Sequence, residues 1–128
     1  MFIRFVTDSV QRNSGRREGI FQAAYRLRRS GALAEYEEAR LADALRWFDA
    51  HLDKPDRFAR SRRPHREANA LCWFKAGAAE HLARIREVQH ILDSHGIAVE
   101  MITSRRPGYL VYEDDVQVAA CPFDETPG

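Results

Sequence analysis

The residues best suited to binding chemistry are arginines in the stretch from Pro55 to Gly96. This stretch also holds the longest amphipathic pattern of the chain. Arginine's planar guanidinium binds a phosphate or carboxylate group through two parallel hydrogen bonds. An arginine-rich loop and a second arginine turn supply the expected polyanion-binding residues: Arg57, Arg60, Arg62, Arg63, His65, Arg66, Arg105 and Arg106. The competing interpretation is a solvated loop whose arginines pair with nearby acidic side chains.

The tetrapeptide Ser-Arg-Arg-Pro occurs twice, at residues 61–64 and 104–107. The two turns would form one site if the chain brought them together, and the sequence leaves that open. A helix is also predicted to begin near Arg66, and the unsatisfied amides of its first turn favour an anion. We therefore expect a phosphate or sulfate to bind beside Arg63, His65 and Arg66.

Catalytic groups have weaker support in the sequence. His81 falls on the apolar side of a predicted helix, where a lone histidine is usually a hydrogen-bonded core residue. The alternative is a general acid or base tuned by burial, acting with Lys75 or an arginine. The acidic run 113–115 could bind a divalent cation, but three acids in a tight turn are typical of solvated turns. His90 and His95 lack the i, i+4 spacing of a helical metal pair. We predict no metal and no cofactor, and the sequence leaves enzymatic activity open while favouring a protein without it.

The composition limits the classes of protein that the chain can belong to. Its 128 residues, 45% hydrophobic and 30% charged, suit one domain with a single core. The formal net charge of +1 means that nucleic-acid binding would need a local basic patch. Cys72 and Cys121 are the only cysteines, without zinc-ligand spacing. With no secretory signal or membrane-spanning run at the start, we predict a cytoplasmic protein without a membrane partner.

Hydrophobic periodicity predicts one strand, three helices and three further strands: 2–7, then 19–30, 33–52 and 66–95, then 97–103, 109–112 and 116–120. Arg4 interrupts the apolar run of the first strand, which predicts that one face of this strand meets solvent or a sheet edge. The third helix would be roughly 45 Å long. A kink near Gly77, or a start later than Arg66, would shorten it.

The order β-α-α-α-β-β-β predicts an α+β fold, a single domain over residues 1–128 with three helices packed on one face of a three- or four-stranded antiparallel sheet. The last three strands are expected to form a meander. The first strand is expected to join them at an edge or in the middle. The tail from about residue 124 is expected to be disordered.

Three segments, RSRRP, CWFK and PGYLVYEDDVQVAACPF, together resemble parts of short uncharacterised bacterial proteins with no assigned activity. The resemblance covers roughly the C-terminal half of the chain. It implies a bacterial source and a compact single domain. It implies no activity, cofactor or catalytic residue.

The sequence supports three functional hypotheses. The first is a small non-enzymatic binding protein whose arginine-rich loop contacts a polyanion, namely RNA or DNA. The second is a protein-interaction or dimerisation module, in which the arginines meet an acidic partner protein and the sheet edge, Trp47 or Trp73 is buried against it. A homodimer belongs to this second hypothesis. The third is a small hydrolase or transferase that uses His81.

Overall fold

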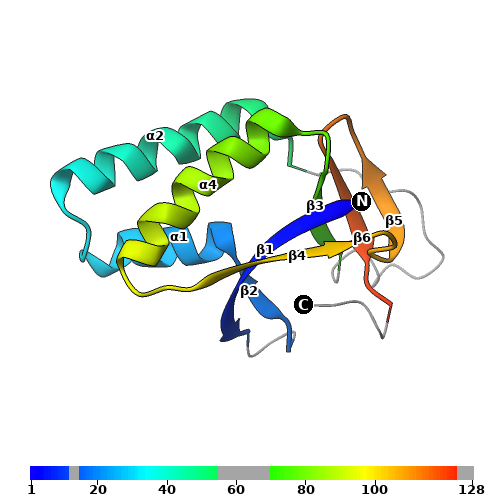
Figure 1. The fold of residues 1–128 in the computed structure, drawn as a ribbon, viewed down its shortest axis with the longest axis horizontal. Helices are drawn as coiled ribbons and strands as arrows, with labels where there is room; N and C mark the ends of the chain where they lie inside the picture. Colours follow the sequence, from blue (N-terminus) through cyan, green and yellow to red (C-terminus); the bar gives the residue numbers. More distant parts are fainter. Residues whose placement is uncertain (12–14, 55–69, 124–128) are drawn as a thin grey trace.

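The computed structural model describes residues 1–11, 15–54 and 70–123. The strands are β1 (Phe2–Val10), β2 (Arg17–Gly19), β3 (Leu71–Lys75), β4 (Val99–Ser104), β5 (Tyr109–Glu113) and β6 (Gln117–Cys121). The helices are α1 (Ile20–Ser30), α2 (Glu35–His51) and α4 (Ala79–Ser94). Over the described ranges the fold is therefore α+β, with three helices and one six-stranded antiparallel sheet (Figure 1).

Strand β1 lies in the middle of the sheet. Along one edge it pairs with β4, from Phe2 opposite Ser104 to Thr7 opposite Val99. Along its other edge it pairs first with β3, at residues 2 and 3, and then with β2, at residues 6 and 10. Strand β6 continues the sheet beside β3, and β5 follows β6. Two strands thus share one edge of β1, and residues 4 and 5 lie between the two pairings.

The main core lies between the helices and one face of the sheet. Successive side chains of a strand point to opposite faces, so Ile3 and Phe5 share the face that the helices cover. Phe5 packs edge to face on Phe74 of β3, with 6.5 Å between the ring centroids. The helices contribute buried side chains spaced three or four residues apart: Ala23, Ala24, Leu27, Leu41, Leu45, Phe48, Ile85, Val88 and Leu92. Figure 1 shows α1, α2 and α4 together on one side of β1, with β5 and β6 at the other end of the sheet.

Helices α1 and α2 run antiparallel, as their short connection predicts. Phe21, near the start of α1, packs on Phe48, near the end of α2, with 5.0 Å between the ring centroids. At the opposite ends, Arg28 Nε donates to Glu38 Oε1 at 2.9 Å. Gly31 ends α1 with a φ of 74°, a left-handed conformation that glycine adopts without strain. The predicted boundaries of both helices are confirmed to within two residues.

The prediction of one long helix from Arg66 to His95 was wrong in its first part. Leu71–Lys75 forms strand β3, and α4 begins only at Ala79. Trp73 and Phe74 point to opposite faces of the sheet and are both buried. A strand covered on both faces shows no alternation of apolar and polar residues, so it looks like part of a helix. The later helix start that the pattern also allowed is the one observed.

The predicted meander was also wrong. Strand β4 pairs with β1, and of the two expected hairpins only the one joining β5 and β6 forms. The sheet has more strands than predicted because β3 was assigned to a helix and the short polar strand β2 was not recognised. Arg4 lies on a central strand and is 9% exposed, so the expectation of a solvent-facing or edge position was wrong.

None of the described helices is long and apolar enough to cross a membrane. The predicted disordered tail from about residue 124 lies outside the described residues.

Candidate functional site

A cavity of about 230 Å³ lies at the gap between β2 and β3, beside the unpaired stretch of β1. Its walls come from β1, the start of α1, the end of α2, β3 and β6. The lining residues are Arg4, Phe5, Gly19, Ile20, Phe21, Gln22, Leu52, Ala70, Leu71, Cys72, Trp73, Phe74 and Gln117. Mostly apolar walls with a few polar groups are typical of small-molecule sites.

Arg4 is the charged group of this cavity. Its Nη2 donates to the carbonyl oxygen of Arg17 at 3.4 Å, a long hydrogen bond, while its buried Nη1 has no acceptor among the described residues. Burial is the main cause that lowers the pKa of Arg4 to about 10, and the charge of Arg16 lowers it further. The guanidinium is still protonated at neutral pH. A buried cation without a counter-ion is costly, so an anion bound here would stabilise the folded protein.

The first turn of α1 lies at the same cavity. Gly19 has no side chain to cap the helix, and no acidic residue lies in the first turn. The Gly19 N–H donates to Gln22 Oε1 at 3.1 Å. The positive end of the helix dipole therefore faces the cavity without a neighbouring carboxylate from that turn. Trp73 adds a second buried donor, because its Nε1 also has no acceptor among the described residues.

A polar network holds β2, and with it the start of α1, against β1. Glu18 Oε1 accepts from Thr7 Oγ1 at 3.0 Å, and Glu18 Oε2 accepts from Arg26 Nε at 3.0 Å. The hydrogen bonds from Arg26 lower the pKa of Glu18. Arg17 Nε donates to the carbonyl oxygen of Thr7 at 2.8 Å, and Arg17 Nη1 pairs with Glu100 of β4 at 2.8 Å. These contacts fix the distance between Arg4 and the first turn of α1.

Cys72 lines the cavity and is exposed. The protein atoms around it raise the pKa of its thiol by desolvation, and the charge of Arg4 offsets this only in part. A raised pKa leaves little thiolate at neutral pH, so Cys72 is not an activated nucleophile.

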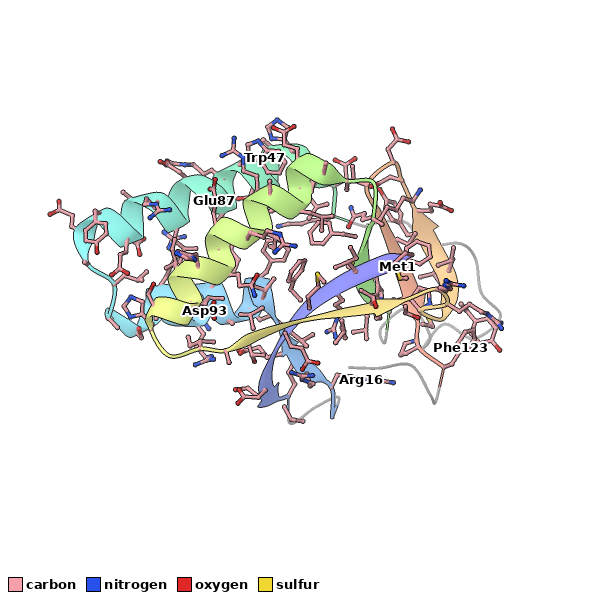
Figure 2. All side chains as sticks on the ribbon, viewed as in Figure 1. Met1, Arg16, Trp47, Glu87, Asp93 and Phe123 are labelled. Atoms are coloured by element: carbon pink, nitrogen blue, oxygen red, sulfur yellow. The ribbon has the colours of Figure 1, made fainter. Side chains whose placement is uncertain are left out.

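Most of the predicted polyanion-binding residues lie outside the described residues: Arg57, Arg60, Arg62, Arg63, His65 and Arg66. Their role stays a prediction, as does the convergence of the two Ser-Arg-Arg-Pro turns. Arg105 and Arg106 are exposed in the turn between β4 and β5. The guanidinium carbon of Arg106 lies 5.4 Å from the ring centroid of Phe123, which Figure 2 shows at the edge of the molecule.

His81 is a hydrogen-bonded core residue at the start of α4. Its Nε2 lies 2.7 Å from the carbonyl oxygen of His51 and must carry the proton, because a carbonyl only accepts. Its ring is 4.7 Å from that of Trp47, and the residue is 9% exposed. Lys75 Nζ pairs with Glu113 at 2.7 Å. No hydrogen bond between described residues joins His81 to Lys75, so the catalytic pair imagined from the sequence is not assembled.

The two tryptophans differ in accessibility. Trp73 is 1% exposed and cannot be a surface contact. Trp47 is half-buried, stacks on His51 with 4.4 Å between the ring centroids, and has the guanidinium of Arg84 at 5.2 Å. Figure 2 shows Trp47 on the side of the molecule opposite Arg16. Only Trp47 therefore offers surface to a partner.

The acidic turn, residues 113–115, connects the two strands of the hairpin, β5 and β6. Asp114 Oδ1 accepts from the backbone N–H groups of Val116 at 2.9 Å and Gln117 at 3.0 Å. Its Oδ2 accepts from the hydroxyl of Tyr112 at 2.9 Å. These hydrogen bonds lower the pKa of Asp114 against the opposing effect of burial. The carboxylate is occupied in closing the turn, as the solvated-turn interpretation expects.

Comparison of the chain with protein-family models, with curated proteins and with solved structures found no match. The site therefore has to be judged from its own residues. Sequence reasoning missed its central members: Arg4, the first turn of α1, and Trp73. One signal was available, because an arginine inside the apolar run FIRFV is unusual unless the side chain has a binding or pairing role.

Proposed function

We propose that this chain is a small non-enzymatic binding protein that recognises a polyanion, RNA or DNA, through arginine. The observation that carries the proposal is the concentration of positive charge beside β2. Arg4 and Arg17 are joined by a hydrogen bond, and Arg16 precedes Arg17 in the chain. The charges of both Arg16 and Arg17 act on Arg4, in addition to its burial, to lower its pKa. Such a cluster attracts phosphate groups.

The connectivity of the chain adds support. Leu52 and Ala70 both line the Arg4 cavity, and the sequence between them contains Arg57, Arg60, Arg62, Arg63 and Arg66. The described residues on either side of the arginine-rich stretch are thus close to Arg4. We propose that the stretch and the described arginines serve the same polyanion.

A titration with single-stranded RNA and DNA, followed by fluorescence anisotropy at several salt concentrations, tests this function. Binding is expected to weaken steeply with salt, because bound phosphates release counter-ions. The triple substitution of Arg60, Arg62 and Arg63 by Ala is expected to weaken binding at least about tenfold. It should also reduce the slope of log K against log salt by about 2.

The matched control removes the same charge elsewhere. Arg29, Arg40 and Arg86 are exposed residues on α1, α2 and α4. Their triple substitution by Ala is expected to leave the salt slope nearly unchanged. Equal losses in both triple variants would mean that net charge alone drives binding. Absence of binding at low salt would remove the polyanion from consideration.

A second candidate function, a protein-interaction or dimerisation module, is favoured by the edge of the sheet at β5. Among the described strands β5 pairs with β6 alone. Its Tyr109 is 55% exposed and its Leu110 is 46% exposed. An exposed apolar edge strand can pair with the edge of a second chain. This candidate predicts a dimer held by backbone hydrogen bonds along β5.

Light scattering over a range of protein concentrations tests the second candidate. If β5 forms the interface, Leu110→Lys is expected to weaken the dimer at least about tenfold, because the charge must be desolvated at the new contact. Tyr36→Lys, at a residue of α2 that is 69% exposed, is the control and should leave the dimer intact. A wild-type chain that stays monomeric at high concentration would contradict this candidate.

A further inference from the structure

The start of β5 carries an exposed aromatic ring beside two arginines. Tyr109 is the first residue of the strand, and more than half of its surface is exposed. Arg105 and Arg106 lie in the turn that precedes it, and both are exposed. Single-stranded nucleic acids stack their bases on exposed rings of this kind and place their phosphates on neighbouring cations. This end of β5 therefore combines the two chemical groups that such a strand contacts.

The ring contacts around Tyr109 bring the cation to the exposed ring. Tyr109 meets Phe123 in a T-shaped contact, with 4.7 Å between the ring centroids and 77° between the ring planes. In a T-shaped pair the edge of one ring points at the face of the other, so Phe123 covers at most one face of the Tyr109 ring. The guanidinium of Arg106 lies over the same Phe123, at 5.4 Å from its centroid. Phe123 thus holds Tyr109 and Arg106 close together at the edge of the molecule (Figure 2).

The backbone fixes this surface. The N–H of Arg106 donates to Ser104 Oγ at 3.1 Å and so orders the turn after β4. Tyr109 is paired with Cys121 of β6, and Gly108, just before it, lies against the carbonyl group of the same Cys121. A surface that is already ordered loses little conformational entropy when a ligand binds to it.

Charge distinguishes Tyr109 from Tyr36, the other tyrosine that is more than half exposed in the part of the chain that the structure describes. Tyr36 lies in the first turn of α2 together with Glu35, Glu37 and Glu38. Carboxylates around a ring repel the phosphates of a nucleic acid, whereas the arginines before Tyr109 attract them. Tyr36 is therefore an exposed ring without the matching charge, which makes it a suitable control.

We propose that the start of β5 is a stacking site for one base of a single-stranded RNA or DNA. The base stacks on Tyr109, and the phosphates next to it in the strand contact Arg105 and Arg106. A base in a duplex already stacks on its neighbours, so the site selects a single strand. The inference rests on the proposed polyanion-binding function and adds to it a contact with a base.

A short oligothymidylate and an abasic strand of the same length test the proposal, because they carry the same phosphates and differ only in their bases. Fluorescence anisotropy at low salt is expected to show that the abasic strand binds the wild type at least about fivefold more weakly. Tyr109→Ala is expected to lose this difference and to bind both strands equally. Tyr109→Phe keeps a ring and should retain the difference, as should the control Tyr36→Ala. For a duplex, Tyr109→Ala is expected to change the affinity by less than about twofold.

The phosphate contact has its own test. Arg106→Gln is expected to weaken the binding of the two strands by the same factor, because it removes a charge and leaves the ring of Tyr109. It should also lower the slope of log K against log salt by about 1. An unchanged slope would refute the contact between Arg106 and a phosphate.

The outcomes separate this inference from the function on which it rests. Equal binding of the two strands to the wild type would overturn the stacking site and leave polyanion binding in place. The stacking site would also be wrong if Tyr109→Ala kept the difference between the strands, because the base would then stack elsewhere. Absence of binding at low salt would remove the polyanion function and the stacking site together. Polyglutamate that competes as well as oligothymidylate would mean that the arginines meet an acidic protein instead.

Discussion

Gly108→Ala is expected to lower the free energy of unfolding by about 3 kcal/mol, the largest loss that we expect from one added methyl group. Gly108 precedes β5 with a φ of 148°, a conformation that strains any residue with a Cβ. A Cβ there would lie 2.0 Å from the carbonyl oxygen of Cys121 and 2.9 Å from the Cα of Pro122. Both are backbone atoms at the end of β6, so the strand itself must move. Urea unfolding followed by circular dichroism measures the change.

The control for this substitution is Gly77→Ala. A Cβ at Gly77 meets no atom within 4 Å, and the φ of Gly77 is not positive. Alanine reduces the freedom of the unfolded chain, so stability is expected to stay level or rise by up to about 1 kcal/mol. If Gly108→Ala and Gly77→Ala gave the same free energy of unfolding, the close approach of the two backbones at Gly108 would be refuted.

Arg4→Met is expected to raise the free energy of unfolding by about 1–3 kcal/mol. Burial lowers the pKa of Arg4 from its usual range to about 10 in the folded protein. The folded state therefore disfavours the charged form, and each pKa unit corresponds to about 1.4 kcal/mol. This penalty is present in full below pH 10, which includes neutral pH. Methionine has similar length and no charge, but it loses the long hydrogen bond to Arg17, so the net gain is smaller than the full penalty.

Urea unfolding at pH 7 without added ligand measures this gain. Arg46→Met, at a side chain that is 73% exposed, is the control and should change stability by less than about 0.5 kcal/mol. A loss of more than about 1 kcal/mol in Arg4→Met would mean that the guanidinium already has a stabilising partner. A gain in stability is the pattern of a residue that is kept in the sequence at a cost in stability.

The helices α1 and α2 could be predicted from the sequence because their signals are local. Apolar residues three or four apart, the glycine after Ser30 and the glutamates that begin α2 all lie within the elements that they define. Strand β3 could not be predicted in the same way. Trp73 and Phe74 are both buried, so the period of two that marks a half-buried strand is absent.

The candidate site could not be predicted because its parts meet only through long-range pairing. Arg4, the first turn of α1 and β3 come together because β2 and β3 share one edge of β1. Nothing near Arg4 in the sequence indicates which strands will flank it. The density of arginines from Arg57 to Arg66 was visible locally, and it led to a polyanion hypothesis most of whose residues lie outside the described ranges.

The central place of β1 determines when the protein can fold during synthesis. Strands β1 and β2 are synthesised one shortly after the other, before β3 and β4. The β1 partners β3 and β4 are made much later, the last of them from Val99 to Ser104. Until β3 and β4 have been made, β1 lacks its partner along the whole β4 edge and along part of the other edge, and unpaired strand edges are prone to non-native pairing. The sheet can close only after β4 has left the exit tunnel, so assembly of this domain is a late and comparatively slow event.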